Sequence, residues 1–253
     1  MGSRFEADAY YNKGITSGRL KRYDEALAAF DQVLRLDPNN AGAHYNKGVT
    51  LANLGRYDEA LLAYDQVLRL DPNNARAYNS KGATLDDLKR YDEALAAFDQ
   101  ALLHDPNDAD AYYSKGNVLA NLRRYNKALL AYDQALRLDP HDANTYFQRG
   151  LALANLGRYD EALLAFEQAT RLDPHDVVAY KNKGLALANL GRNDQALLAF
   201  EQALRLDPND ARAYHYRGLA LASLGRNDEA KAAFEQVIRL DPTYASLHLI
   251  KRN

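Results

Sequence analysis

Proline occurs at one fixed interval along this chain of 253 residues, and no other feature constrains the fold as strongly. Each of the seven prolines lies 34 residues after the one before it: Pro38, Pro72, Pro106, Pro140, Pro174, Pro208 and Pro242. A glycine (Gly14 to Gly218) and an alanine (Ala26 to Ala230) recur at the same interval. A fixed period of this length indicates stacked copies of one supersecondary unit.

Each copy has the pattern of two helices, as the segment Ala41–Asn74 illustrates. Two stretches with apolar residues at helical spacing lie on either side of Gly55, which can adopt the left-handed conformation that ends a helix. Pro72 ends the second stretch because it lacks a backbone N–H, and Asn74 is a suitable N-cap for the next first helix. The sequence therefore predicts an all-α protein built from antiparallel helical hairpins.

Small residues are expected where the two helices of a hairpin meet. We expect Gly48 and Ala60 to face each other, with Tyr64 and Leu54 filling the space around them. A larger side chain at either small position should overpack the pair. One hairpin cannot bury its apolar faces alone, so its stability should come from stacking on its neighbours.

These residues resemble the tetratricopeptide repeat family, whose pattern appears in the third copy as Tyr78, Gly82, Leu85, Ala94, Phe98, Ala101 and Pro106. The resemblance implies a single right-handed α-solenoid superhelix of seven repeats, with the first helices lining a concave groove. The predicted boundaries are 1–6 for an N-terminal leader or cloning remnant, then 7–40, 41–74, 75–108, 109–142, 143–176, 177–210 and 211–244 for the repeats, and 245–253 for a partial C-terminal helix. Leu247 and Ile250 of that helix are expected to cap the seventh repeat.

Two of the chain's departures from the family pattern place basic residues at offsets that are usually uncharged. The residue before the repeated glycine is basic instead of apolar, and we expect its aliphatic stem to pack while its charged end stays in water. These residues are Lys13, Lys47, Lys81, Lys115, Arg149, Lys183 and Arg217. At the bend, Lys21, Lys89 and Arg123 replace glycine, at a cost of about 1 kcal/mol each if the left-handed conformation is kept.

Composition argues against several classes of partner. Lys and Arg total 32 and Asp and Glu total 34, so the net charge of −2 provides no basic field for nucleic acid or anionic lipid. The absence of cysteine fits a reducing compartment, and we expect a cytoplasmic location. No apolar run is long enough to span a membrane. We therefore expect neither nucleic acid nor membrane as a partner.

The sequence contains no motif for catalysis or for cofactor binding. The histidines lack metal-ligand spacing, and His141 and His175 simply share one loop offset. The pair Asp24 and Glu25, like its equivalents, begins a helix and forms no acid–base pair in a pocket. With no phosphate-binding glycine loop and no nucleophile motif, we expect a protein that is not an enzyme and that holds neither cofactor nor metal.

The early positions of the first helices vary most between copies, and the family resemblance places them in the groove. We predict that this groove binds an extended or helical protein segment through Tyr11, Asn12, Tyr45, Asn46, Asn79, Tyr113, Asn117, Phe147, Gln148, Leu151, Lys181, Asn182, Leu185, His215 and Leu219. The side-chain amides resemble the ladder by which some superhelical repeat proteins hold a peptide backbone, because an amide offers both a donor and an acceptor. The alternative is that these residues are only solvated helix faces.

The groove is expected to change in character along the chain. The first four copies should favour basic segments because they carry Asp8, Asp86, Asp87 and Asp110, although Arg19 and Arg76 dilute this acidity. Leucine and alanine dominate the last three copies, which should favour apolar segments. The clamp by which some family members grip the carboxylates of chaperone tails would fall on Tyr11, Ile15, Asn46, Arg76 and Ser80. Apart from Arg76 this set lacks the cations that a clamp needs, so we do not expect chaperone-tail binding.

A second candidate surface lies on the second helices, where leucine occupies an offset that is commonly polar in the family: Leu62, Leu130, Leu164 and Leu198. These leucines either fill space beside small alanines or form an outer apolar strip for self-association through the convex face. The ends of the chain offer another route to self-association. Three alternatives to a groove-binding scaffold stay open: a self-assembling structural module, a targeting arm of a larger multidomain protein, and a designed or consensus-like repeat protein.

Overall fold

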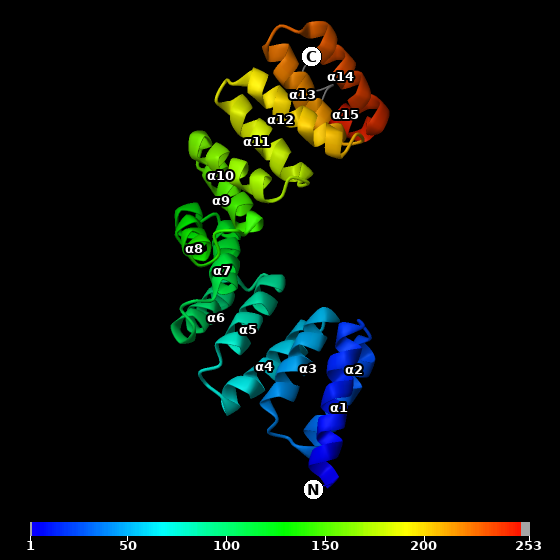
Figure 1. Ribbon diagram of the computed structural model, residues 1–253, viewed down its shortest axis with the longest axis vertical. Helices are drawn as coiled ribbons and strands as arrows, with labels where there is room; N and C mark the ends of the chain where they lie inside the picture. The colour runs from blue at the N-terminus through cyan, green and yellow to red at the C-terminus, as the bar shows by residue number, and fades with distance from the viewer. Residues whose placement is uncertain (1, 249–253) are drawn as a thin grey trace. The chain divides into compact units, whose positions relative to one another are not determined.

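The computed structural model describes residues 2–248, which form fifteen α-helices and no strand (Figure 1). In chain order they are α1 (Gly2–Arg19), α2 (Tyr23–Leu36), α3 (Ala41–Asn53), α4 (Tyr57–Leu70), α5 (Ala75–Asp87), α6 (Tyr91–His104), α7 (Ala109–Asn121), α8 (Tyr125–Leu138), α9 (Ala143–Asn155), α10 (Tyr159–Leu172), α11 (Val177–Asn189), α12 (Asn193–Leu206), α13 (Ala211–Ser223), α14 (Asn227–Leu240) and α15 (Pro242–His248). Odd-numbered helices up to α13 are the first helices of the copies, and even-numbered helices are the second helices. The predicted all-α class and the tandem helical pairs are confirmed.

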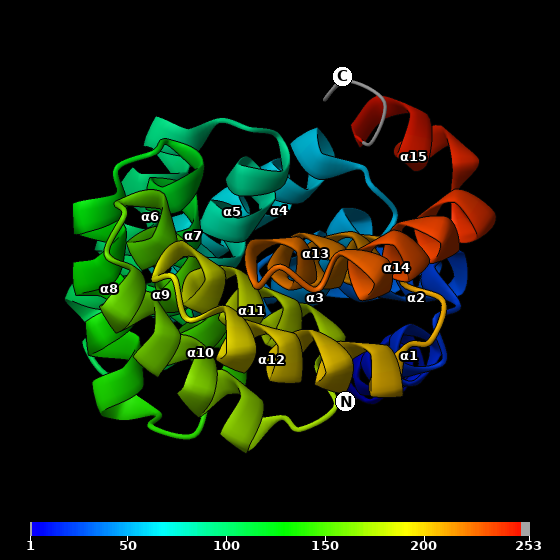
Figure 2. The same cartoon turned by 90° about the horizontal axis from the view of Figure 1, so that it is seen from above.

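The helices form two compact units, α1–α7 and α8–α15, which divide between Arg123 and Arg124. Within each unit every helix packs on the next one along the chain. Successive first helices also contact one another: α1, α3, α5 and α7 do so in the first unit, and α9, α11 and α13 in the second, where Figure 2 shows α11 between its two neighbours. Among the described residues no two second helices make a comparable contact. Each unit therefore curves toward its first helices, whose accessible side we call the inner surface.

Side chains cap the first helices as the sequence predicts. Asn74 Oδ1 accepts a hydrogen bond from the backbone N–H of Ala77 at 2.9 Å, and an Asn or Asp caps α3, α7, α9, α11 and α13 in the same way. The second helices begin differently: Arg56 donates to both carboxylate oxygens of Glu59, at 2.7 and 2.6 Å. These bonds lower the pKa of Glu59, whose charge also favours the N-terminal end of the helix dipole.

Each bend between a first and a second helix contains one residue in the left-handed conformation. Gly55 has a φ of +71°, and Lys89 keeps the same conformation with a φ of +58°, as do the other two cations predicted at this offset. At Lys89 the backbone N–H of Arg90 donates to the carbonyl of Leu85 at 2.8 Å, which closes a Schellman motif. The condition stated for these cations is therefore met, and the cost of about 1 kcal/mol each applies.

The closest approach within a hairpin is between a glycine and an aromatic ring. A Cβ atom placed on Gly48 would lie 2.6 Å from Cε1 of Tyr64, whose side chain is 1% exposed. Equivalent contacts join Gly14 to Phe30, Gly82 to Phe98, Gly150 to Phe166, Gly184 to Phe200 and Gly218 to Phe234. The prediction that Tyr64 fills the space around Gly48 and Ala60 is therefore confirmed: its ring lies against the glycine, and Ala60 is buried in the same cluster.

The two ends of the chain differ from the predicted boundaries. Helix α1 includes residues 2–6, which were expected to be a leader. Helix α15 begins at Pro242, because proline suits the first turn of a helix and Asp241 Oδ1 caps it by accepting from the N–H of Tyr244 at 2.8 Å. The predicted cap by Leu247 and Ile250 falls on side chains outside the described part of the structure.

Replacing Gly48 by alanine should destabilise the protein by roughly 1–3 kcal/mol, because the new methyl group would press on the buried ring of Tyr64. Gly18→Ala is the matched control: the atom nearest to a Cβ there is that of Ala26, 4.0 Å away. Alanine at this helical position should stabilise the protein by up to about 1 kcal/mol. Urea unfolding followed by circular dichroism measures both changes, and equal midpoints for the two variants would contradict the close contact.

Candidate binding surface on the first helices

Two of the predicted groove tyrosines join one repeat to the next. Tyr11 packs edge-on against Phe30, with ring centroids 6.0 Å apart, and its hydroxyl accepts a hydrogen bond from Asn46 at 2.9 Å. Tyr45 repeats this arrangement one copy later, with its hydroxyl 2.9 Å from the hydroxyl of Ser80. These rings are therefore held at both ends, and sequence reasoning missed their role at the junctions.

Polar residues at the same offset reach the N-cap of the following first helix. Asn79 donates to Asp108 Oδ2 at 3.1 Å, and Lys181 forms an ion pair with Asp210 in which the side chains are only 16% and 10% exposed. Each of these carboxylates also accepts the capping N–H of its own helix, so it stabilises the helix start and the junction together. A separation of 29 residues from an N-cap Asp is the sequence signal that could have found these pairs.

The aromatic residues at this offset are also packed against neighbouring rings. Phe147 lies against Phe166, with centroids 5.8 Å apart. His215 is 8% exposed and packs between the rings of Phe234 and Tyr244, so it does not belong to the accessible inner surface as predicted. The reason is that α15 brings Tyr244 over it. The other predicted residues keep at least partly exposed side chains: Asn12, Tyr113, Asn117, Gln148, Leu151, Asn182, Leu185 and Leu219.

The side-chain amides of the inner surface already use some of their hydrogen atoms within the protein. Asn46 donates one N–H to Tyr11 and the other to the carbonyl of Gly42 at 2.8 Å, so Oδ1 is the group it can offer to a ligand. Asn182 likewise donates to the carbonyl of Val178 at 2.9 Å. The predicted pair of donor and acceptor is thus corrected at Asn46, which offers an acceptor alone.

An apolar row runs along the inner surface of the second unit. Leu151, Leu185 and Leu219 are half-buried at the same offset of α9, α11 and α13. Beside them, the exposed Asn155 and Asn189 each donate to the carbonyl of a leucine in the row, at 2.8 Å. Sequence reasoning did not single out these asparagines, although they recur at the last residue of the first helices. The row has the apolar character expected of the C-terminal copies.

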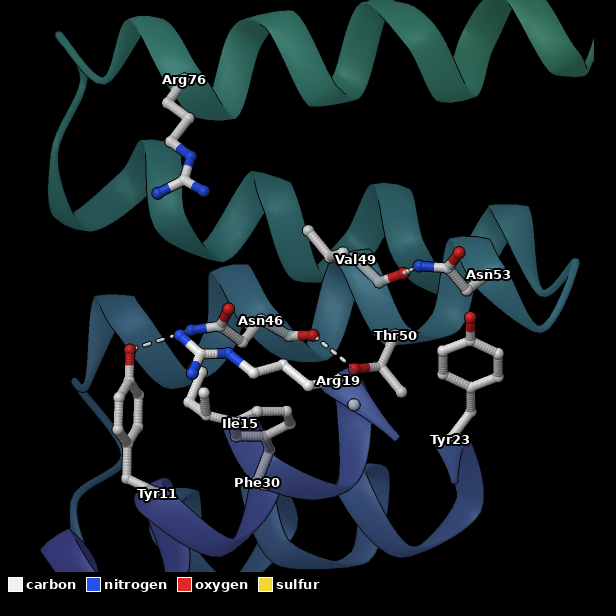
Figure 3. Close-up of a pocket in the computed structure, with 12 residues that line it drawn as sticks. Tyr11, Ile15, Arg19, Tyr23, Phe30, Asn46, Val49, Thr50, Asn53 and Arg76 are labelled. Atoms are coloured by element: carbon white, nitrogen blue, oxygen red, sulfur yellow. Dashed lines mark hydrogen bonds between the residues drawn. The ribbon is translucent and has the colours of Figure 1, made fainter. Parts of the chain in front are cut away.

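A cleft of about 460 Å³ opens on the inner surface of the first unit, between α1, α3 and α5, with Tyr23 and Phe30 of α2 also in its lining (Figure 3). It brings together Tyr11 and Asn46 of the predicted groove set with the apolar side chain of Ile15. Arg19 from α1 and Arg76 from α5 both extend into it, toward the end where Tyr11 and Asn46 lie. Among the described residues no carboxylate lines this cleft.

The acidity predicted for the first copies does not reach this cleft. Asp86 is half-buried on α5, and burial raises the pKa of its carboxyl group while a hydrogen bond with Asn121 opposes that rise. Asp8, Asp87 and Asp110 lie outside the lining of the cleft. Inside this cleft the lining charges are those of Arg19 and Arg76, so the acidity on which the expected preference for basic segments rests lies elsewhere on these copies.

Exposed ion pairs also join successive repeats. They involve the basic residue before the repeated glycine, whose charged end was expected to be solvated. Lys47 Nζ lies 2.7 Å from Asp31 Oδ1 of the preceding second helix, and Lys81 lies equally close to Asp65. Equivalent pairs are Lys115–Asp99, Arg149–Asp133, Lys183–Glu167 and Arg217–Glu201. Partly exposed pairs of this kind contribute about 0–1 kcal/mol each.

The side chains of the four second-helix leucines that form the second candidate surface are exposed to solvent. Leu62, Leu130, Leu164 and Leu198 are between 61% and 67% exposed. The reading in which they fill space beside small alanines is therefore wrong, and the outer apolar strip is the reading that the exposure favours.

Neither a metal cluster nor a membrane span is found in the part of the chain that the structure describes. Residues 2–248 contain no group of three or more His, Cys, Asp or Glu side chains placed to hold a metal ion. None of the described helices is both long and apolar enough to cross a membrane.

Models of the tetratricopeptide repeat match residues 11–75, 79–143, 116–181 and 181–245, so the chain belongs to the tetratricopeptide repeat family. It is similar to the solved structure of YrrB, described as a tetratricopeptide protein with an unusual peptide-binding site, at 28% identity over 75% of this chain and 98% of that chain, with a TM-score of 0.67. MamA is 28% identical over 69% of this chain and 94% of its own, with a TM-score of 0.61. The C-terminal part of a repeat protein from Cytophaga hutchinsonii shares the fold at 18% identity, covering 92% of this chain and 96% of its own with a TM-score of 0.78. No curated protein matches the sequence.

Lys181→Met should destabilise the protein by about 1–3 kcal/mol, because Asp210 would stay largely buried without its ion-pair partner. Lys47→Met is the matched control, since its pair with Asp31 is 30% and 47% exposed and its loss should cost about 0–1 kcal/mol. Urea unfolding of both variants measures the difference. An equal loss of stability in the two variants would show that the junction at Asp210 is no stronger than an exposed pair.

Proposed function

We propose that this protein is a non-enzymatic scaffold that binds an extended or helical protein segment along the inner surfaces of its units. The observation that carries the proposal is the shape and chemistry of those surfaces: a cleft in the first unit, lined mainly by first helices, and a row of half-buried leucines on the first helices of the second. Tetratricopeptide repeats form a fold that mediates protein–protein interaction, and the similar protein YrrB is described as having a peptide-binding site.

The residues of the second unit suit a peptide ligand. Half-buried leucines offer apolar area that a bound side chain would remove from water, while Asn155 and Asn189 beside them each keep one amide N–H for the peptide backbone. Because the leucines lie on packed helices, the surface is organised before the ligand arrives, which lowers the entropic cost of binding.

Leu185→Asp should weaken binding of peptides selected on this protein from a displayed random library by about tenfold or more, because a charge would replace apolar contact area. Leu198→Asp is the matched control: the same change in the same unit, on an exposed second-helix leucine. Titration by fluorescence anisotropy measures the affinities, with circular dichroism to verify the fold. If Leu198→Asp weakens binding as much as Leu185→Asp, the inner surface is not the binding surface.

The exposed leucines of the second helices favour self-association as a second candidate function. A single exposed leucine is ordinary on a soluble protein. In the second unit, however, Leu130, Leu164 and Leu198 recur at one offset on α8, α10 and α12 and are all more than 60% exposed. Recurrence at the same offset gives a repeated apolar feature that a second copy of the chain could cover.

If this second function holds, the average mass in light scattering should rise with protein concentration, and a Leu164→Gln, Leu198→Gln variant should stay monomeric over the same range. The reason is that glutamine removes most of the apolar area which association would bury. A monomeric unaltered protein at every concentration would exclude self-association through these leucines.

A further inference from the structure

We infer that the cleft between α1, α3 and α5 takes the acidic side chain of an extended peptide segment, held between Arg19 and Arg76. This inference rests on the proposed function, since it names the chemistry of the segment that the inner surface of the first unit would bind. It reverses the preference for basic segments that composition alone suggested for these copies.

The charges of the cleft are the first line of support. Arg22, Arg56 and Arg90 of the same unit each pair with a glutamate in the first turn of the helix that follows. In contrast, Arg19 and Arg76 form no ion pair with any residue that the structure describes, and both extend into one cleft without a carboxylate (Figure 3). Two guanidinium groups directed into the same partly enclosed space repel each other, so an anion between them is stabilised by both.

The second line of support is that Arg76 is already positioned. Its guanidinium carbon lies 4.6 Å from the centroid of the Tyr45 ring, and the Tyr45 hydroxyl is fixed by its hydrogen bond with Ser80. A guanidinium that stacks on a ring through its face keeps its N–H edge available, and that edge matches a carboxylate with two parallel hydrogen bonds. Little side-chain freedom then remains to be lost when the ligand binds.

The remaining groups of the cleft suit the backbone and an apolar neighbour in the same segment. Asn46 has both amide hydrogens engaged, so its Oδ1 can accept from a peptide N–H. Asn53 donates one hydrogen to the carbonyl of Val49, which leaves its other N–H and its Oδ1 for a ligand. Ile15 and Val49 are half-buried apolar side chains between these groups. The segment expected here alternates acidic and apolar residues.

This combination of charges is confined to the first unit. At the offset of Arg19 the first helices of the second unit carry Asn155, Asn189 and Ser223. The offset of Arg76 carries Asn144, Val178 and Arg212 there. Arg19 and Arg76 lie two repeats apart, on α1 and α5. The same spacing therefore gives no second pair of cations on α9, α11 and α13.

The test uses three fluorescein-labelled peptides with amidated C-termini, in which leucine alternates with glutamate, glutamine or lysine, and a fourth glutamine peptide with a free C-terminal carboxylate. Fluorescence anisotropy with the full chain should show the glutamate peptide binding about tenfold more tightly than the amidated glutamine peptide, with the difference shrinking at high salt. Arg19→Gln with Arg76→Gln should abolish this preference. Arg35→Gln with Arg69→Gln, which removes two exposed arginines outside the cleft, should leave it intact.

Several outcomes would overturn the inference: equal affinity for the glutamate and glutamine peptides, tighter binding of the lysine peptide, or a preference that survives in the Arg19, Arg76 variant. A preference for the free-carboxylate peptide alone would point to a chain terminus instead of an acidic side chain. If the acidic preference fails but Leu185→Asp still weakens library-selected peptides, the proposed scaffold function stands without this inference. If no peptide binds in either experiment, both are rejected.

Discussion

The contact between the first-helix glycine and the second-helix ring sets the distance between the two helices of a hairpin, and other contacts depend on that distance. Because Gly48 has no side chain, the ring of Tyr64 lies directly against the backbone of α3. Tyr45 packs on that ring, with centroids 6.0 Å apart, and presents its hydroxyl to Ser80 of the next repeat. The packing inside the hairpin therefore determines where Tyr45 meets the next repeat. Burial of the Tyr64 ring also raises the pKa of its hydroxyl, as expected for a group removed from water.

Features that depend on the backbone preferences of single residues were predictable from the sequence. Proline and glycine punctuation gave the helical pairs, Asn74 and its equivalents gave the N-caps, and Lys89 kept the left-handed bend. Features that depend on how repeats stack were not predictable. The bonds from Asn79 to Asp108 and from Lys47 to Asp31 join residues 29 and 16 positions apart, and only the stacking brings them together.

The candidate site follows the same division. The offsets of the inner surface could be predicted, because the family resemblance places the variable positions of the first helices there. Which polar groups stay available to a ligand could not be predicted, because contacts between repeats already engage some of them. Asn46 donates both amide hydrogens, to Tyr11 and to the carbonyl of Gly42, and α15 covers His215. From the sequence, Arg19 and Arg76 only offset the charge of nearby carboxylates. In the structure both line one cleft, where together they can bind an anion.

The junction bonds also mean that the repeats are not interchangeable, although some of their segments are identical. Leu51–Ala63 of the second repeat and Leu153–Ala165 of the fifth have the same sequence, yet Tyr45 of the second repeat reaches a hydroxyl in the following repeat while Phe147 of the fifth has no polar atom to offer. In the sixth repeat the same offset carries Lys181, which pairs with a capping carboxylate. Deleting or duplicating a repeat by recombination within the gene would place unmatched partners side by side, for example Lys181 beside a neighbour that carries asparagine at its cap. The contacts at the junctions therefore fix the order of the repeats. A repeat can be gained or lost without loss of stability only where the residues at the new junction can still bond to each other.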